Sequence, residues 1–347
     1  EDEKYTFFGG RTQELEKRTK VKARIVSHAL RELILESKDV MIMGHTNGDI
    51  DSIGSSMGIY RLAADLGKPA YIVNTSYGLS LANFIETLGE DENYKNVIIN
   101  KNESIAKISP ETLLVIVDTD KRTYVDVPEL LKETSKIVII DHHRRSTDFI
   151  DDAMLTFHEV YASSAAELVT EIIEYSEVDV KLTELEAEAL YAGIMMDTKN
   201  FTFKTGVRTF EAAAYLRKCG VDIITVKKWF QSDLETYNKI SKIVAKAEIT
   251  NDTIAIAICE EQDKNVNIIC AKAADELLTI SNVTASFVIG NSGDKIYISG
   301  RSIGDINVQL ILEKLGGGGH ITLAGAQVEG MTIEEVKQEL INRINEY

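Results

Sequence analysis

The sequence predicts an α/β fold with an N-terminal, mostly parallel sheet covered by helices on both faces, plus a smaller C-terminal α+β domain. Two observations predict the first part. From residue 39, short apolar runs alternate with helical patterns, and the runs are rich in Val and Ile along their whole length. Such runs are typical of parallel strands that are buried on both faces. After about residue 225 the pattern changes to alternating strands, and 347 residues are enough for two domains.

The elements of the N-terminal part follow from periodicity. Residues 11–38 are predicted to form one long helix because Ala23, Val26, Leu30 and Leu33 recur at spacings of three and four. Strands are expected at 40–43, 71–73, 97–99, 113–117 and 137–140, and helices at 55–66 and 164–175. Residues 183–219 are predicted to be helical, with Asp197 inside a break.

The C-terminal part is predicted to begin with a connecting helix from Thr225 to Ala247. Strands are expected at 254–258, 285–289 and 296–299, and helices at 264–280 and 305–315. A last helix, 333–347, follows Thr332, and Glu335 three residues on completes a capping box.

Composition excludes several classes of function. The net charge of −17 disfavours a surface that binds long nucleic acid, which is usually basic. Three widely spaced cysteines without a C-x-x-C pair indicate a reducing compartment. No apolar run approaches the ~20 residues of a membrane span and no signal peptide is visible, so no direct membrane contact is expected.

Acidic and imidazole side chains follow three of the predicted strands. His45, Asp49 and Asp51 follow the strand at 40–43, Asp118 and Asp120 the strand at 113–117, and Asp141, His142 and His143 the strand at 137–140. Ligands bind at the carboxyl ends of the strands in an open parallel sheet. Each motif alone is also explained by helix capping or a turn, but their conjunction at one edge, which Asp197 could reach from the helical region, favours a metal site.

These donors suit two divalent ions. Carboxylates with imidazoles and without thiolates favour a hard or borderline ion such as Mn²⁺ or Mg²⁺. In two-metal sites the ions lie about 3.5–4 Å apart and clamp an in-line displacement at phosphorus. One carboxylate must then bridge the ions. We prefer Asp118, which ends its apolar run directly, and Asp120 stays the alternative.

The C-terminal part contains a run of four glycines, Gly316, Gly317, Gly318 and Gly319, followed by His320. One glycine can end the preceding helix, and four exceed that need. Glycines let backbone N–H groups approach a phosphate. With Arg301 as a fixed positive charge, the run is predicted to contact a ligand, and a flexible hinge is the alternative.

Together these motifs resemble the DHH phosphoesterase superfamily. The residues that carry the resemblance are GHTNGDID at 44–51, VDTD at 117–120, DHH at 141–143, Asp197, and GGGGH at 316–320, which resembles the signature of the DHH-associated C-terminal domain. The finer pattern is similar to the phosphodiesterase portion of GdpP-type proteins, through FFGG at 7–10, AGIMMDTKNF at 192–201 and INVQLILEKLGGGGH at 306–320.

The resemblance implies a two-metal phosphodiesterase that converts the cyclic dinucleotide cyclic di-AMP to linear pApA by in-line attack of a metal-bridging hydroxide. It implies Mn²⁺, with Mg²⁺ or Co²⁺ as options, and a cytoplasmic domain of a membrane-anchored bacterial protein, with a homodimer left open. The implied organisation is a linker helix (1–38), a DHH catalytic domain (39–224), a connecting helix (225–247) and a DHH-associated substrate-binding domain (248–347).

The resemblance also implies a role for each site residue. His45 and Asp49 would bind one ion, and Asp51, His142 and Asp197 the other, with Asp118 bridging. Asp141 would orient its neighbours, and His143 would face the phosphate and assist the leaving oxygen. The glycine run with His320 would hold the nucleotide.

Three rival functions stay open. The first is a short-oligonucleotide or 3′-phosphoadenosine phosphatase of the same superfamily. The second is a nucleotide sensor without turnover, against which the complete ligand set argues. The third is an inorganic pyrophosphatase, which would leave the glycine run unexplained.

Overall fold

The computed structural model describes residues 20–78, 81–145, 148–260, 265–293, 295–319 and 321–347. The chain divides into two compact units between Gln231 and Ser232, and each is described by itself. The helix predicted over 11–38 is present as α1 (Lys20–Glu36). Its part before residue 20, the FFGG segment and His320 lie outside the described residues.

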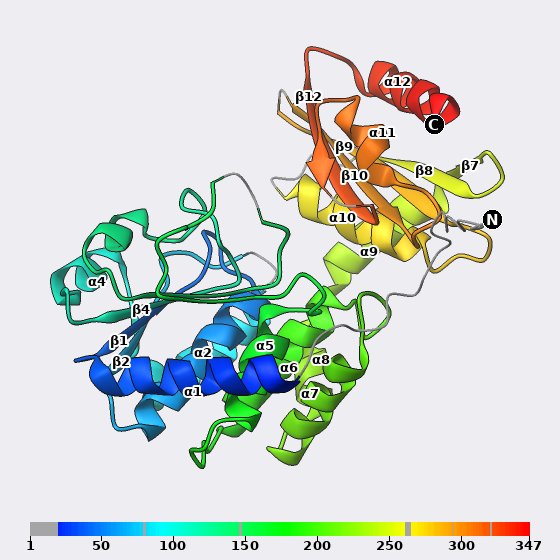
Figure 1. Ribbon diagram of the computed structural model, residues 1–347. Coiled ribbons are helices and arrows are strands. Elements are labelled where there is room, and N and C mark those ends of the chain that lie inside the picture. The colour runs from blue at the N-terminus through cyan, green and yellow to red at the C-terminus, as the bar shows by residue number, and fades with distance from the viewer. Residues whose placement is uncertain (1–19, 79–80, 146–147, 261–264, 294, 320) are drawn as a thin grey trace, which may run out of the picture. The chain divides into compact units, whose positions relative to one another are not determined.

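The first unit contains a six-stranded sheet in which every paired neighbour is parallel (Figure 1). The strand order is β3-β2-β1-β4-β5-β6. The strands are β1 (Val40–Met43), β2 (Ala70–Val73), β3 (Ile98–Ile99), β4 (Leu113–Val117), β5 (Ile137–Asp141) and β6 (Leu155–His158). This confirms the predicted parallel sheet. Strand β6 was not predicted, because it mixes polar and apolar residues and is only partly buried.

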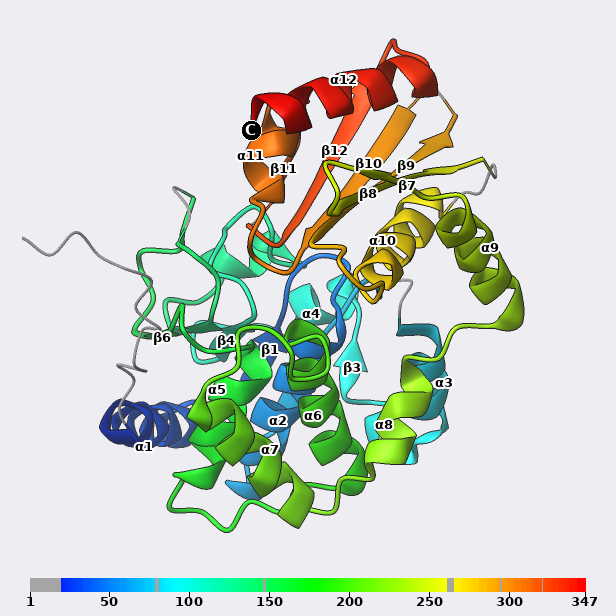
Figure 2. The same cartoon turned by 90° about the vertical axis from the view of Figure 1, so that its right-hand side faces the viewer.

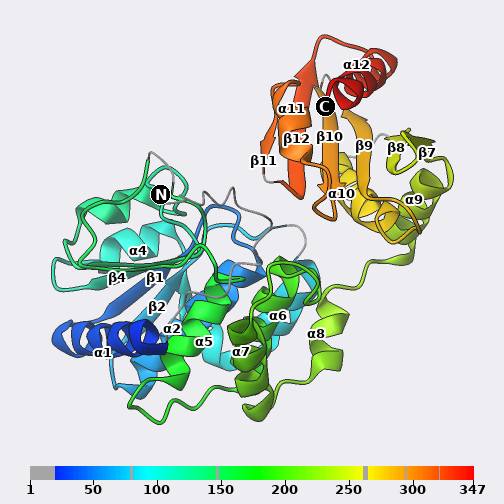
Figure 3. The ribbon, with the colours of Figure 1, turned by 45° about the vertical axis from the view of Figure 1, so that its right-hand side comes forward.

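Helices α1, α2, α5 and α6 cover one side of this sheet in Figures 1, 2 and 3. The first unit's helices besides α1 are α2 (Ile50–Asp65), α3 (Ala82–Glu90), α4 (Lys101–Lys107), α5 (Ala165–Glu174), α6 (Glu184–Asp197), α7 (Val207–Lys218) and α8 (Ile223–Trp229), with short 3₁₀ turns at Glu92–Tyr94 and Pro128–Lys132. No helix among the described residues is long and apolar enough to cross a membrane.

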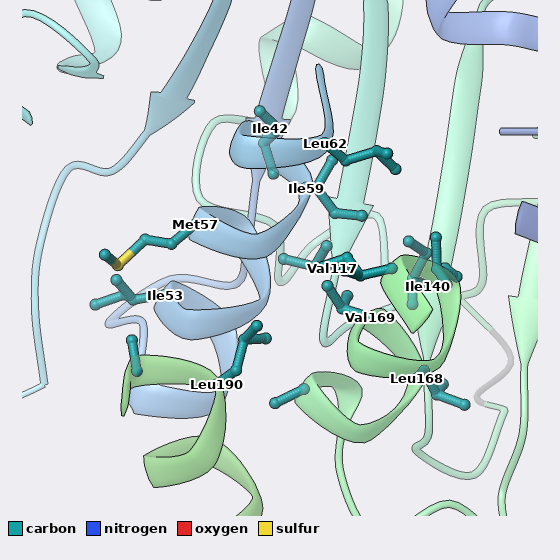
Figure 4. Packing of buried hydrophobic residues seen from close by; sticks show 14 of the residues in the cluster. Ile42, Ile53, Met57, Ile59, Leu62, Val117, Ile140, Leu168, Val169 and Leu190 are labelled. Atoms are coloured by element: carbon teal, nitrogen blue, oxygen red, sulfur yellow. The ribbon is translucent and has the colours of Figure 1, made fainter. Parts of the chain in front are cut away.

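The core of the first unit lies on both faces of the sheet. On one face, Ile42, Val117 and Ile140 pack with side chains of α2, α5 and α6 (Figure 4). On the other face, Met41 and Ile116 join a second cluster that includes the 3₁₀ turn Pro128–Lys132. Successive strand residues point to opposite faces, so burial on both faces explains why the strands read as continuous apolar runs.

Two glycines let α2 and α6 approach each other closely. A Cβ on Gly54 of α2 would lie 2.5 Å from the carbonyl oxygen of Ala189, and a Cβ on Gly193 of α6 would lie 2.7 Å from Oδ1 of Asp51. Atoms cannot pack this closely, so a side chain at either position would push the helices apart. The contact places Asp51 against α6.

Two sequence predictions are wrong in detail. The connecting helix over 225–247 is instead two helices, α8 and α9 (Leu234–Ala245), because the Asp233 side chain caps a new helix by accepting a hydrogen bond of 2.8 Å from Thr236 N. Asp197 is not inside a break but is the last residue of α6. The break follows it, where Lys199, Asn200 and Phe201 have φ of 46°, 56° and 60°.

The second unit is an α+β unit, as predicted, with a mixed sheet in the order β11-β12-β10-β9-β8-β7. Only β8 and β9 pair in parallel among these strands as described. The strands are β7 (Glu248–Thr250), β8 (Ile254–Cys259), β9 (Ala285–Ser292), β10 (Lys295–Ser302), β11 (Gly318–Gly319) and β12 (Leu323–Glu329). Helices α9 and α10 (Val266–Leu277) pack on one face, and α11 (Val308–Glu313) and α12 (Ile333–Glu346) on the other (Figure 2). The predicted capping box of Thr332 and Glu335 is present.

Candidate active site and metal centre

The loop after β1 is tied to neighbouring loops by its backbone. The N–H of Thr46 donates to the carbonyl of Tyr124 over 2.9 Å, and the N–H of Gly78 donates to the carbonyl of Gly48 over 3.0 Å. These bonds fix the loop at the carboxyl end of the sheet, where its acidic and imidazole side chains meet those that follow β4 and β5.

His45 has the tautomer that a metal ligand needs. Its Nδ1 donates to the Thr46 carbonyl over 2.9 Å, so the neutral ring keeps its lone pair on Nε2. Nε2 lies 3.4 Å from Oδ2 of Asp118 and 3.8 Å from Oδ2 of Asp49. The Tyr124 ring stacks on the imidazole, with centroids 5.1 Å apart. His45, Asp49 and Asp118 therefore present three ligand atoms to one point.

Asp49 is both a helix cap and a candidate ligand. Its Oδ1 accepts hydrogen bonds from the N–H groups of Asp51 and Ser52 at the start of α2, over 3.0 and 3.1 Å. Its Oδ2 is the oxygen that faces His45. The cap orients the carboxylate and leaves one oxygen for an ion, so the capping and metal-binding explanations hold together.

Asp118 lies between two histidines. Its Oδ2 is 3.4 Å from Nε2 of His45 and its Oδ1 is 3.4 Å from Nε2 of His142. The residue follows β4 with φ of 62°, a left-handed conformation that side chains other than glycine rarely adopt. Asp and Asn adopt this conformation more readily than other side chains, and residues that hold it gather at functional sites. Each carboxylate oxygen of Asp118 therefore faces a different histidine.

The second group of ligand atoms comes from Asp51, His142 and Asp197. Nε2 of His142 lies 3.2 Å from Oδ2 of Asp197 and 3.9 Å from Oδ2 of Asp51. Asp51 is fully buried, and its two oxygens accept hydrogen bonds of 2.8 Å from the N–H groups of Ala165 and Ala166 at the start of α5. The helix N-terminus thus holds the carboxylate in place and favours its negative charge.

His143 stands beside both groups and opens to solvent. Its Nδ1 donates to Oδ1 of Asp141 over 2.9 Å and lies 3.6 Å from Oδ1 of Asp118. Its side chain is 44% exposed. Because Nδ1–H of His143 donates a hydrogen bond to Asp141, Nε2 is the nitrogen that can exchange a proton with a ligand in the adjoining cavity.

The charges of the site require compensation. Burial and the neighbouring carboxylates of Asp118 and Asp197 raise the pKa of Asp51 well above its usual range. Burial alone would lower the pKa of His45, but Asp118 and Asp49 outweigh it and raise that pKa to about 12. Within the described residues, the buried Oδ1 of Asp118 and both ring nitrogens of His142 have no hydrogen-bond partner. Carboxylate oxygens and imidazole nitrogens in this arrangement fit divalent cations.

A cavity of about 180 Å³ adjoins these groups. It is lined by His45, Asp49, Asp118, Thr119, Asp120, Lys121, Tyr124, His143 and Asp197. Asp120 lines it without joining either three-residue group, and lies instead with Asp141 and His158.

The glycine run of the second unit is held against β12. Gly316 has φ of 77°, and a Cβ on Gly317 would lie 2.3 Å from the carbonyl oxygen of Gly325, so both positions require glycine. Gly318 and Gly319 form β11, which pairs with β12. An open cavity of about 550 Å³ is lined by Asn267, Tyr297, Ile298, Ser299, Gly316, Gly317, Gly318, Gly325, Ala326 and Gln327.

Arg301 is not among the described residues that line this cavity. Its Nε donates to Oδ1 of Asp275 over 3.1 Å, and its guanidinium also donates to the carbonyl of Gly300 over 2.9 Å. The side chain is buried in these contacts. The structure therefore joins Arg301 to α10 and the glycines to β12.

Comparisons with known proteins agree with this geometry. Residues 39–194 match the family model described as the DHH family, N-terminal domain, and residues 239–347 match the DHHA1 domain. The chain belongs to the DHH family. This member is 44% identical over 348 residues to the cyclic-di-AMP phosphodiesterase PdeA of Listeria monocytogenes, and 44% identical over 349 residues to the cyclic-di-AMP phosphodiesterase GdpP of Geobacillus thermodenitrificans.

Both alignments cover 99% of the DHH-family chain, which spans about half (53%) of the length of each of these curated relatives. Among solved structures, the fold is similar to that of an exopolyphosphatase-related protein from Bacteroides fragilis. The TM-score is 0.76 at 19% identity, and the match covers 92% of this chain and 96% of the other.

Sequence reasoning missed three residues at the site of this DHH-family chain. Lys121 and Tyr124 line the cavity, and His158 hydrogen-bonds to the backbone of His143. Lys121 and Tyr124 could have been considered as site residues from the sequence, because they follow Asp118 within six residues. His158 had none, because the strand that carries it was not predicted.

Proposed function

We propose that the chain is a metal-dependent phosphodiesterase that hydrolyses cyclic di-AMP to linear pApA. The observation that carries the proposal is Asp118, whose two oxygens face the histidines of two separate ligand groups, 3.4 Å from each. The names of the 44% identical relatives support the substrate. The DHH and DHHA1 matches support the reaction class.

The proposed ligands divide into two groups that share Asp118. His45 and Asp49 would hold one ion, and Asp51, His142 and Asp197 the other. Two bound divalent ions lower the pKa of coordinated water and neutralise phosphate charge. The donor set contains carboxylates and imidazoles without a thiolate, which favours Mn²⁺, with Mg²⁺ or Co²⁺ as alternatives.

His143 is proposed to act on the leaving group. Hydrolysis adds water across one P–O3′ bond, so the departing 3′-oxygen must gain a proton. Nε2 of His143 is positioned to supply that proton, because Nδ1 is engaged by Asp141. Asp141 is thus proposed to orient His143 rather than to bind either of the two catalytic ions.

The second unit is proposed to hold the nucleotide through Gly316–Gly319 and His320. The cavity beside Gly316, Gly317 and Gly318 supports this role. Arg301 is proposed to contact the nucleotide as well, with Asp275 orienting its guanidinium. We further propose that the chain works as the cytoplasmic part of a membrane-anchored bacterial protein.

A substrate panel tests the proposal. The protein is incubated with Mn²⁺ and, separately, with cyclic di-AMP, pApA, a short RNA and pyrophosphate, and the products are resolved by anion-exchange chromatography. Linear pApA is expected to accumulate from cyclic di-AMP, and excess EDTA is expected to stop the reaction.

Each other outcome selects a rival. Cleavage of only pApA or short RNA would favour the short-oligonucleotide phosphatase, and cleavage of only pyrophosphate the pyrophosphatase. Tight binding of cyclic di-AMP without turnover in Mn²⁺ would favour the sensor.

A further inference from the structure

A separate cluster of ligand atoms lies beside the six proposed metal ligands. Asp120 follows β4, Asp141 ends β5 and His158 ends β6. Each offers one ligand atom, and these atoms lie within 4.8 Å of one another. Asp141 and His158 are direct partners across the β5–β6 pair. The cluster is therefore built by the sheet itself.

The carboxylates of this cluster are buried and unpartnered. Asp120 is 3% exposed and Asp141 is fully buried. In the part of the chain that the structure describes, both carboxylate oxygens of Asp120 and Oδ2 of Asp141 have no hydrogen-bond partner. Buried carboxylates normally have a hydrogen-bond donor or a cation. These buried, unpartnered carboxylate oxygens thus call for a positive charge beside them.

The guanidinium of Arg145 does not supply this positive charge. Nε of Arg145 lies 4.0 Å from Oδ2 of Asp120, which is beyond hydrogen-bond distance, and the Arg145 side chain is 51% exposed. Its guanidinium lies over the Phe149 ring, 4.8 Å from the centroid. Solvent therefore screens this pair.

The imidazole of His158 is oriented by its own hydrogen bond. Nε2 donates to the carbonyl of His143 over 2.6 Å, so this nitrogen has no lone pair for a cation. Nε2 lies 3.9 Å from Oδ2 of Asp141. His158 therefore borders the cluster, and the donor set consists of the Asp120 and Asp141 carboxylates, which suit a hard divalent cation.

We propose that Asp120 and Asp141, bordered by His158, form a third cation site, which takes a divalent ion such as Mn²⁺ or Mg²⁺. It is distinct from the pair of ions around Asp118 and does not depend on the substrate. Asp141 connects the two regions, because its Oδ1 accepts from His143 while its Oδ2 belongs to the new site. An ion held there fixes the Asp141 carboxylate and, through it, the His143 ring.

Counting bound Mn²⁺ tests the site. The full chain is equilibrated with Mn²⁺ by dialysis, and the metal per chain is measured by atomic emission. The wild-type chain is expected to bind one ion more than Asp120→Asn, which keeps the shape of the side chain and removes its charge. Asp152→Asn is the matched control, because Asp152 is exposed, at 58%, and lies in the same unit. It is expected to bind as many ions as the wild type.

Two results would overturn the proposal. One is an equal ion count for the wild type and folded Asp120→Asn. The other comes from Asp141→Asn, which serves also if Asp120→Asn fails to fold as judged by circular dichroism. We expect Asp141→Asn to weaken the last ion bound by about 10-fold or more, and an unchanged affinity would exclude Asp141 as a ligand and the site with it.

Discussion

Asp118→Asn is expected to lower the turnover of cyclic di-AMP by about a thousandfold or more at saturating Mn²⁺. Each oxygen of Asp118 faces the histidine of a different ligand group. The amide removes the charge and leaves one oxygen, so the two groups lose their shared ligand. A thousandfold loss corresponds to about 4 kcal/mol of transition-state stabilisation, within the several kcal/mol that a metal clamp supplies. The measurement is kcat for pApA formation.

Asparagine suits this test because it tolerates the left-handed backbone that Asp118 adopts, with φ of 62°. A loss of activity then reports on the carboxylate rather than on the backbone. Asp152→Asn, at an exposed carboxylate, is expected to keep its full rate. Full activity in folded Asp118→Asn would mean that the shared-ligand assignment is wrong.

Gly193→Ala is expected to destabilise the first unit by about 1–3 kcal/mol. The new Cβ would lie 2.7 Å from Oδ1 of Asp51 and 2.9 Å from its Cα, and it would also meet Cβ of Ala166 at 2.9 Å. These neighbours belong to the packed helices α2 and α5, so the methyl group must force them apart. Since Asp51 moves with α2, the variant should also need more Mn²⁺ for half-maximal activity. Urea unfolding followed by circular dichroism measures the change in stability.

Gly89→Ala is the matched control in another helix. Among the described residues, nothing lies within 4 Å of a Cβ at Gly89, so only helix propensity changes. This variant is expected to be more stable by about 0.5–1 kcal/mol. If Gly193→Ala unfolded at the same urea concentration as Gly89→Ala, close packing at Gly193 would not constrain Asp51.

The parallel sheet and the gathering of His45, Asp51 and His142 were predictable because both follow from local patterns. Continuous apolar runs indicated strands buried on both faces, and the carboxyl ends of parallel strands meet at one edge. The choice between Asp118 and Asp120 was not fixed by any local pattern. The distances that favour Asp118 are tertiary, since its two oxygens face His45 and His142 while Asp120 lies with Asp141 and His158.

Other features required tertiary information. The ion pair of Arg301 with Asp275 joins residues 26 positions apart, and no periodicity marks it. Strand β12, with the sequence LAGAQVE, has small residues and alternates buried with exposed positions, so it lacked the apolar run of the other strands. The glycine run was recognisable from composition, but the need for Gly317 comes from its approach to Gly325.

Anomalous diffraction at the manganese edge, from crystals grown with Mn²⁺, locates the ions proposed around Asp118. Besides the separate ion proposed at Asp120 and Asp141, two peaks about 3.5–4 Å apart are expected on either side of the Asp118 carboxylate. One would lie against His45 and Asp49, and the other against Asp51, His142 and Asp197. A single ion at Asp118, or a pair of ions bridged by Asp120 instead, would contradict this arrangement.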